Sequence, residues 1–302
     1  MSELNQNNSE EIDFQEIFDA IWNAKIRIAI LTSIFAIFSV FYALSIPNQY
    51  KSSALLIPAQ QEGGTVSNSL GQIGDLASLA GVNLGNDKNN EAKIAEEIMK
   101  SWAFIESFIE ENNLAVEIMA AEGWDKESNK LLLNNDIYDA QNKKWISKPT
   151  SWKLFQSFSD RVEVKSDKSS VLMVSVEYYS PQIAKKWLDL YISAINKHMQ
   201  SREIKKVNRN IEYLEEQVLD TSISKMRDIF YGIIGEQIKN KMLAEASPEY
   251  VFIPISPSMI SEEKSKPMRS RICITITLLG GILSVLFFLG LYYFRKYSES
   301  NN

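Results

Sequence analysis

Two apolar runs without a charged residue lie near the two ends of the chain. Residues 28–46 read IAILTSIFAIFSVFYALSI, and residues 272–294 read ICITITLLGGILSVLFFLGLYYF. A helix that crosses the hydrocarbon core of a bilayer needs roughly 20 such residues. Arg271 and Arg295 flank the second run, and charged groups are costly inside hydrocarbon. The sequence therefore predicts two membrane-spanning helices, which places both termini on the same side of the membrane.

The first run could instead belong to a cleaved signal peptide, which carries net positive charge ahead of its apolar part. The leader of this chain is acidic there, with Glu10, Glu11, Asp13, Glu16 and Asp19. Its apolar residues recur at helical spacing, at Phe14, Ile17, Phe18, Ile21 and Trp22. This pattern favours an interfacial helix ahead of a membrane span over a signal peptide.

Basic residues near the two runs give a weak signal for the side of the membrane on which the termini lie. Lys25 and Arg27 precede the first run, which favours cytoplasmic termini by the positive-inside rule. More basic residues precede the second run than follow it, which favours the opposite orientation. Long translocated segments cross largely regardless of charge, so the first indication carries more weight.

The segment between the runs mixes strand and helix signals. Strands are predicted near 49–58, 161–179 and 250–255, the second as an antiparallel hairpin, and the first and last could pair because each adjoins a membrane run. Residues 91–112 predict a helix, and residues 114–149 predict irregular structure with short helices. Residues 61–90 are rich in glycine, which favours a loop, and no G-x-x-x-x-G-K motif for a nucleotide follows.

The strongest helical signal starts at Pro181 and continues to about residue 246. Apolar residues recur at steps of three and four from Ile183 to Val218. An unbroken helix of this length would measure roughly 100 Å at 1.5 Å per residue, with Gly232 and Gly235 as its weak points. Its apolar seam needs a partner, and self-association is the economical solution.

Residues suited to catalysis are scarce in this sequence. The only histidine, His198, lies in a charged helical stretch, and the only cysteine, Cys273, lies in an apolar run, so no zinc set is expected. A net charge of −6 offers no concentrated basic face for nucleic acid. Tryptophans could stack on sugars, although core packing is the commoner role. The sequence thus predicts a protein that is not an enzyme and needs no cofactor or metal.

Several short strings together resemble the chain-length determinant family of polysaccharide co-polymerases. In family order they are residues 12–18, IDFQEIF; 47–50, PNQY; 101–104, SWAF; 184–187, AKKW; 250–252, YVF; and 266–269, KPMR. The chain departs from the family pattern at Ser256-Pro257-Ser258 and Ser261-Glu262, where the family has Asp-Pro-Ala and Pro-Glu. The resemblance nevertheless covers nearly the whole chain.

This resemblance implies a regulator of lipopolysaccharide O-antigen chain length in the inner membrane of a Gram-negative cell. It implies a homo-oligomeric ring that acts with a Wzy-type polymerase on lipid-linked glycan without catalysis of its own. A two-span periplasmic sensor and an envelope export adaptor are the alternative functions.

The predicted fold class is α+β, with two transmembrane helices that flank a periplasmic domain with a membrane-proximal α/β base and a long extended helix. The predicted segments are a cytoplasmic N-terminal segment with an amphipathic helix, 1–27; a first span, 28–46; the periplasmic domain, 47–271; a second span, 272–294; and a cytoplasmic tail, 295–302.

Small residues mark a candidate packing face in the second span. Gly280, Gly281 and Ser284 would allow close approach of another membrane helix, although glycine is also simply common in membrane helices. On the packing hypothesis, Gly281→Leu should loosen the contacts between spans and leave the soluble domain folded.

Overall fold

A computed structural model describes residues 14–59, 88–167 and 171–300 of the chain. It divides into two units, one formed by the two end segments, up to Asn48 and from Lys266, and the other by Gln49–Ser265. The start of the predicted cytoplasmic segment, most of the glycine-rich loop and part of the predicted hairpin turn lie outside the described residues. The two units are taken in turn below.

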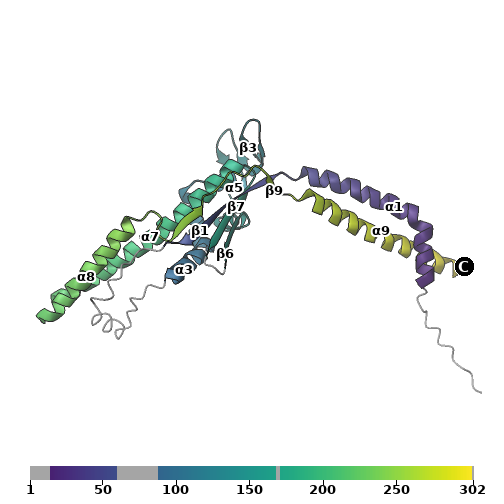
Figure 1. Ribbon diagram of the computed structural model, residues 1–302. Helices are drawn as coiled ribbons and strands as arrows, with labels where there is room; N and C mark the ends of the chain where they lie inside the picture. The colour runs from purple at the N-terminus through teal and green to yellow at the C-terminus, as the bar shows by residue number, and fades with distance from the viewer. Residues whose placement is uncertain (1–13, 60–87, 168–170, 301–302) are drawn as a thin grey trace, which may run out of the picture. The chain divides into compact units, whose positions relative to one another are not determined.

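The end unit consists of helices α1 (Phe14–Ser45) and α9 (Arg269–Ser300), which lie side by side (Figure 1). Their apolar stretches, Phe18–Ser45 and Arg269–Phe294, have mean hydropathies of 2.2 and 2.6 and are long enough to cross a membrane. Only 11% of the most apolar window in each helix is buried. That exposure is expected of lipid-facing helices and not of core helices in a soluble protein, so the predicted pair of membrane helices is confirmed.

The middle unit is built on an antiparallel sheet of strand order β6-β7-β1-β8, and β9 (Lys264–Lys266) also pairs with β1. The other strands are β1 (Gln49–Pro58), β6 (Val162–Ser166), β7 (Leu172–Tyr178) and β8 (Phe252–Ser256). In the β1–β7 register Tyr50 faces Tyr178 and Leu56 faces Leu172. The first and last predicted strands do pair, since Pro58 of β1 faces Phe252 of β8.

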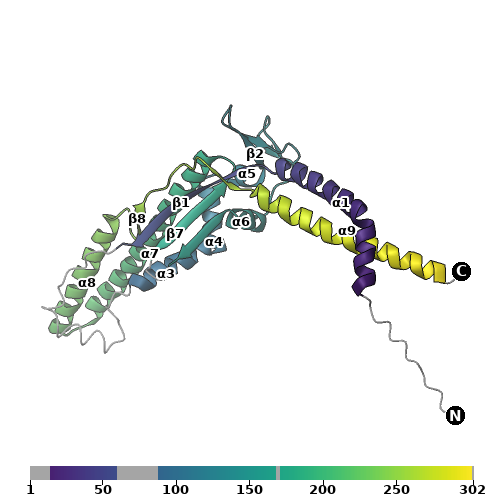
Figure 2. The same cartoon turned by 45° about the vertical axis from the view of Figure 1, so that its right-hand side comes forward.

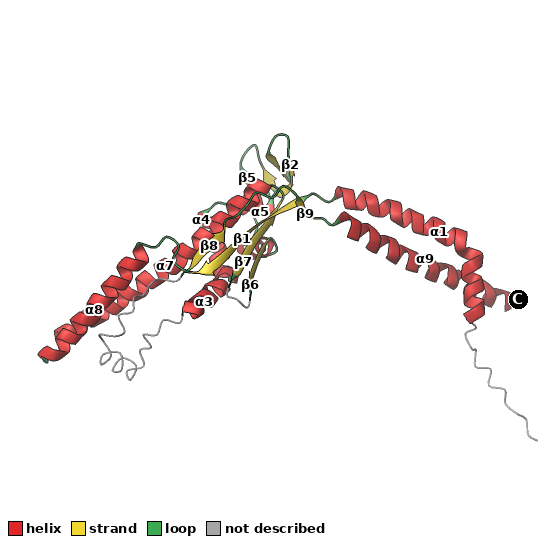
Figure 3. Cartoon of the chain, in the orientation of Figure 1, coloured by secondary structure: helices red, strands yellow, loops and turns green. Residues whose placement is uncertain are grey.

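One face of this sheet is covered along its length, and the other is open except near Ser175. Along β7 the side chains of Leu172, Val174, Val176 and Tyr178 are buried, which is the period-two alternation of a strand with one face inward, and Ser175 on the opposite face is the one buried exception. Figure 3 shows the strands in yellow with α7 (Pro181–Asp220) beside them. The sheet and α7 thus form two layers around one core.

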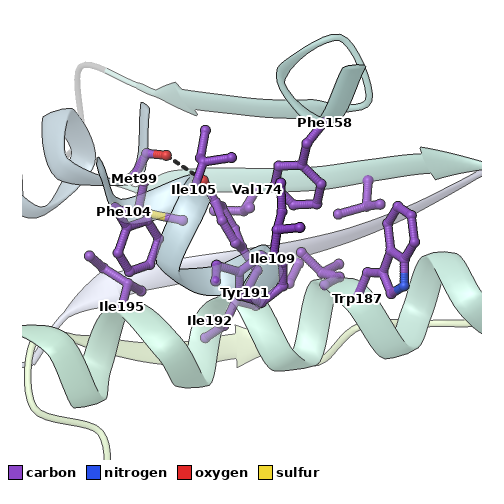
Figure 4. Close-up of a cluster of buried hydrophobic side chains, with 14 of the residues drawn as sticks. Met99, Phe104, Ile105, Ile109, Phe158, Val174, Trp187, Tyr191, Ile192 and Ile195 are labelled. Carbon is purple, nitrogen blue, oxygen red and sulfur yellow. Dashed lines mark hydrogen bonds between the residues drawn. The ribbon is translucent and has the colours of Figure 1, made fainter. Parts of the chain in front are cut away.

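An aromatic cluster forms the centre of that core. Tyr191 of α7 packs against Phe104, Phe108 and Phe158 with ring centroids 5.5, 5.0 and 5.4 Å away, and its hydroxyl donates to the carbonyl oxygen of Met99. Figure 4 shows Tyr191 on α7 with Phe104 and Phe158 near it. Removing one buried aromatic of this kind typically costs about 3–5 kcal/mol.

Three short helices lie on the covered side, and the first and third of them supply the aromatic partners. The three helices are α4 (Trp102–Glu111), α5 (Ala115–Met119) and α6 (Ser151–Ser159), preceded by α3 (Lys88–Lys100). The single helix predicted over 91–112 is therefore two helices. Ser101 interrupts it because this residue is extended (φ −76°, ψ 145°) and its hydroxyl accepts from the backbone N–H of Phe104 as an N-cap.

The segment predicted as irregular contains two small hairpins as well as α5. They are β2 (Ala121–Asp125) with β3 (Lys130–Leu133), and β4 (Tyr138–Asp139) with β5 (Lys144–Trp145). Each turn begins at an aspartate whose carboxylate accepts backbone N–H groups, and each ends at a residue with φ of 51°, Asn129 or Lys143. These Asx turns fix the backbone conformation of the two polar stretches.

The single long helix predicted for residues 181–246 is wrong. The chain forms α7 and a separate helix α8 (Ser224–Glu245), and α8 folds back along α7 (Figure 1). The break lies at Thr221, which adopts an extended conformation (φ −90°, ψ 129°), and not at Gly232 or Gly235, which continue α8. Because α8 folds back, the apolar seam of α7 packs against α8 of the same chain. The sequence had predicted a partner from another copy.

Candidate functional site: a helical arm and a helix pair

The outer part of α7 together with α8, residues 200–245, forms a helical hairpin that we call the arm. Its register is set near the base, where the side-chain amide of Gln200 donates to the carbonyl oxygens of Ala244 (2.9 Å) and Ser247 (3.1 Å). Val207 and Val218 of α7 and Ile234 of α8 are buried in the seam. The steps of three and four between apolar residues of α7 therefore describe an intramolecular contact.

A second apolar stripe on α8 faces away from α7. Tyr231, Gly235, Ile238 and Met242 follow one another at steps of four, three and four, and the three side chains are 60%, 45% and 63% exposed. A Cβ added at Gly235 would meet no atom within 4 Å. This spacing is the coiled-coil pattern, so the α8 stripe presents a helix-packing surface that the described part of the chain leaves uncovered.

Charges at the tip of the arm are separated between its two helices. The last turns of α7 carry Glu215, Glu216 and Asp220, and the first turn of α8 carries Lys225 and Arg227. The helix dipole favours the opposite arrangement, because a helix C-terminus repels negative charge and an N-terminus repels positive charge. These charges therefore oppose the dipoles of their own helices.

Asn196 joins the base of the arm to the sheet. It lies on α7 and is 3% exposed. Its side-chain oxygen accepts from the backbone N–H groups of Val251 and Phe252 (2.9 Å each), and its amide donates to the carbonyl oxygen of Phe252 (3.0 Å). This clamp fixes the point at which the chain leaves the arm and enters β8.

The two helices of the end unit lie in close contact at Gly280. A Cβ at this position would lie 2.5 Å from Cγ and 2.6 Å from Cβ of Phe35 on α1. At Gly281 the nearest atom would be Cγ2 of Thr32, at an ordinary 3.6 Å. Ser284 is buried beside Gly280 and donates its hydroxyl to the Gly280 carbonyl oxygen at 2.6 Å. Of the three predicted residues, Gly280 is the one whose lack of a side chain permits the contact.

A polar contact also joins the two helices at the end where the middle unit is attached. The guanidinium of Arg269 donates through Nε to the carbonyl oxygen of Ala43 (3.1 Å) and through an Nη nitrogen to the side-chain oxygen of Asn48 (3.1 Å). Near the other end, Phe18 stacks on Trp22 and the ammonium of Lys25 lies 4.1 Å from the Trp22 ring centroid. Exposed aromatics with a nearby cation suit a membrane interface.

His198 and Trp187, two residues of types suited to catalysis or to sugar stacking, have packing roles in the middle unit. His198 packs edge-on against Phe104, and partial burial, with Arg202 and Lys205 nearby, lowers its pKa below the usual value. Trp187 is fully buried in the core. Trp102 and Trp152, by contrast, are 46% and 56% exposed, so two tryptophans are free to meet a partner.

Several of these features were missed from sequence. The α8 stripe has a visible signal, since Tyr231, Ile238 and Met242 keep coiled-coil spacing. Helix α6 also has one, because Thr150 follows a proline and its hydroxyl caps the helix by accepting from the backbone N–H of Lys153. The Asn196 clamp has none, as its partners lie 55 and 56 residues away.

A pair of membrane helices at the chain ends, joined through an α+β domain that carries a helical arm, defines a two-span membrane protein with a large domain outside the bilayer. Residues 10–112 match the family model described as chain length determinant protein, Wzz. This region includes α1, β1, α3 and α4. The resemblance to the chain-length determinant family is thus confirmed over this region.

Two solved structures resemble the chain loosely. A full-length bacterial polysaccharide co-polymerase aligns over 94% of this chain and 99% of its own, with 12% identity and a TM-score of 0.39. A fragment of WzzB, a polysaccharide co-polymerase from Salmonella Typhimurium, aligns over 72% of this chain and 100% of its own, with 10% identity and a TM-score of 0.31. A search of curated protein sequences found no match.

Proposed function

We propose that this protein regulates the chain length of a surface polysaccharide, the O-antigen of lipopolysaccharide, as a non-enzymatic scaffold in the inner membrane. The match of residues 10–112 to the chain length determinant family carries the proposal. Deleting the gene should change the length distribution of lipopolysaccharide on a gel, and the wild-type gene on a plasmid should restore it. An unchanged distribution after deletion would refute the proposed function.

In this proposal both termini lie in the cytoplasm and Gln49–Ser265 lies in the periplasm. Lys25 and Arg27 ahead of the first span favour that orientation. A cysteine placed at the exposed turn residue Ser128, in a Cys273→Ser background, should react with a membrane-impermeant maleimide that enters the periplasm of intact cells. A cysteine at Asn23 should react only after lysis. The reverse pattern would overturn the orientation.

Self-association is proposed through the arm. The uncovered α8 stripe supports it, because an exposed apolar seam at coiled-coil spacing is stabilised by packing against another helix. In a ring of identical copies, α8 of one copy would face α7 of the next at the same level. Lys225 and Arg227 of one tip would then meet Glu216 and Asp220 of its neighbour, which relieves the unfavourable charges at both helix ends.

A matched pair of substitutions tests this interface. Ile238→Lys places a charge in the middle of the α8 stripe and should reduce the mass of the oligomer in detergent, measured by light scattering. Leu243→Lys is the control, because Leu243 is similarly exposed (41%) but lies off the stripe. Equal masses for both variants and wild type would show that the stripe is not the interface.

The proposed partners of this ring are a Wzy-type polymerase and its lipid-linked glycan, with membrane lipid around the end helices. A scaffold that holds the polymerase near a growing glycan needs no cofactor. Co-purification of the polymerase with tagged wild-type protein, weakened for Ile238→Lys but not for Leu243→Lys, is the expected result. Equal recovery with all three proteins would show that the polymerase binds independently of ring assembly.

A further inference from the structure

A cleft with a volume of about 500 Å³ runs along one face of α6. Trp152, Phe155, Gln156 and Ser159 line it at steps of three, one and three, the positions that share a helix face, and Met119 of α5 borders it. Figure 2 shows α6 next to α4 on the covered side of the sheet.

The cleft has an aromatic surface that the fold does not use. Trp152 is 56% exposed and packs its ring against Phe155, with centroids 5.2 Å apart and an interplanar angle of 39°. By contrast, Trp187 of α7 is buried in the core, where it packs against Phe158 of α6. An indole left open at the edge of a cleft leaves a large flat apolar area available to a ligand.

The polar groups around this indole suit a neutral ligand with hydroxyl groups. Lys153, Gln156 and Asp160 line the cleft and are exposed, so it offers donors, an acceptor-only carboxylate and an amide that does both. The lysine and aspartate charges offset each other.

A second exposed tryptophan is held in place beside the start of α6. The indole Nε1 of Trp102 on α4 donates to the hydroxyl of Ser151 (3.0 Å), and that hydroxyl donates to the carboxylate of Glu106. Ser151 immediately precedes Trp152. The network fixes the orientation of the Trp102 ring, which is 46% exposed, so the α4–α6 surface carries two oriented aromatic rings.

We propose that the α6 cleft binds a pyranose ring of a glycan, with the apolar face of the sugar on Trp152 and its hydroxyls on Gln156 and Asp160. A sugar ring has one apolar face and a rim of groups that both donate and accept, which matches this combination of surfaces. A protein hot spot would place its polar groups outside an apolar centre, and an anionic lipid or phosphate would call for net positive charge. The inference rests on the proposed function for the source of the glycan, a surface polysaccharide.

The test uses the full-length protein and the O-polysaccharide released by mild acid from the lipopolysaccharide of the strain that encodes it. The protein is reconstituted in lipid nanodiscs, because maltoside detergents would themselves present sugar rings to the cleft. Saturation-transfer NMR reports contact, and titration calorimetry reports affinity. Wild-type protein should bind, and Trp152→Ala should weaken binding by about tenfold or more, as expected for loss of an aromatic anchor.

Further variants separate the cleft from general effects. Asp160→Asn, an exposed isosteric change, should also weaken binding without affecting the fold, while Trp145→Phe removes an indole outside the cleft and should leave affinity unchanged. Absence of binding by wild-type protein, or equal affinity for all four proteins, would overturn the proposal. Loss of oligomer mass in Trp152→Ala with unchanged glycan affinity would overturn it too and identify a protein contact.

This outcome is independent of the proposed function. If gene deletion alters polysaccharide length but the purified protein does not bind the polysaccharide, the regulator function stands and the sugar site fails. If deletion changes nothing, the regulator function fails whatever the binding data show.

Discussion

Replacing Gly280 with alanine tests how closely α1 and α9 pack. The new Cβ would lie 2.5 Å from Cγ and 2.6 Å from Cβ of Phe35, whereas carbon atoms in contact sit roughly 3.5–4.0 Å apart. Rotating the Phe35 side chain about its Cα–Cβ bond moves Cγ but cannot move Cβ, which is fixed to the backbone. The two helices must therefore separate by roughly 1 Å, and overpacking of this kind costs about 1–3 kcal/mol.

Spin labels on exposed positions of the two helices provide the assay. Labels at Ile34 and Leu286, both more than half exposed, are attached in a Cys273→Ser background, and the labelled protein is diluted with unlabelled protein so that only distances within one chain are measured. The interhelical distance in lipid nanodiscs should lengthen or broaden for Gly280→Ala. Each 1.4 kcal/mol of cost changes the ratio of packed to separated helices about tenfold.

Two controls make the result specific. Gly290→Ala adds the same methyl group to α9 where no atom lies within 4 Å, so its distance distribution should match wild type. In the Gly280→Ala background, Phe35→Gly should restore the packed distance, whereas Phe35→Ala should not, because alanine keeps the clashing Cβ. An unchanged distance in Gly280→Ala, or equal rescue by both second substitutions, would refute this account of the packing.

Other predictions concern the middle unit. Asn196→Leu leaves two buried backbone N–H groups beside Phe252 without a partner and should lower the free energy of unfolding by about 2–4 kcal/mol in urea titrations, while Asn208→Leu on the exposed side of α7 should not. The ammonium of Lys165, with help from a second lysine, lowers the pKa of Glu163 to about 2, so Lys165→Met should raise that pKa in an NMR titration. A carboxyl with a depressed pKa stabilises the fold above its unfolded value near 4.5 and loses that effect as the pH falls through about 2. The side chain is 38% exposed, so screening should limit the effect to less than about 1 kcal/mol.

The parts of the fold that sequence predicts are those set by local composition. The two spans follow from runs without charge, and β7 follows from alternation at Leu172, Val174 and Val176. The break at Ser101 has a local signal, because serine is a favoured N-cap residue. The reversal at Thr221 has none, because Thr221, Ser222 and Ile223 fit an exposed turn of helix equally well.

The packing residues show a second limit of sequence. Gly280 and Gly281 are adjacent, and consecutive residues of a helix point about 100° apart. Which of them meets α1 depends on the rotation of α9 about its axis, and nothing in the composition of the run determines that. The structure places Phe35 against Gly280. In the same way, the cleft on α6 depends on which side of that helix faces the core, and Phe158 decides this by pointing inward.

The central position of β1 has a consequence for synthesis of the chain. This strand is made first, but its neighbours β7 and β8 begin only at Leu172 and Phe252. At typical elongation rates, both of its edges stay unpaired for roughly 10 s, and one of them for roughly 20 s. An open strand of this kind invites pairing with other nascent chains, which lysine and proline discourage. Lys51 and Pro58, placed near the two ends of β1, are thus in a position to protect the chain during the interval before its own sheet can close.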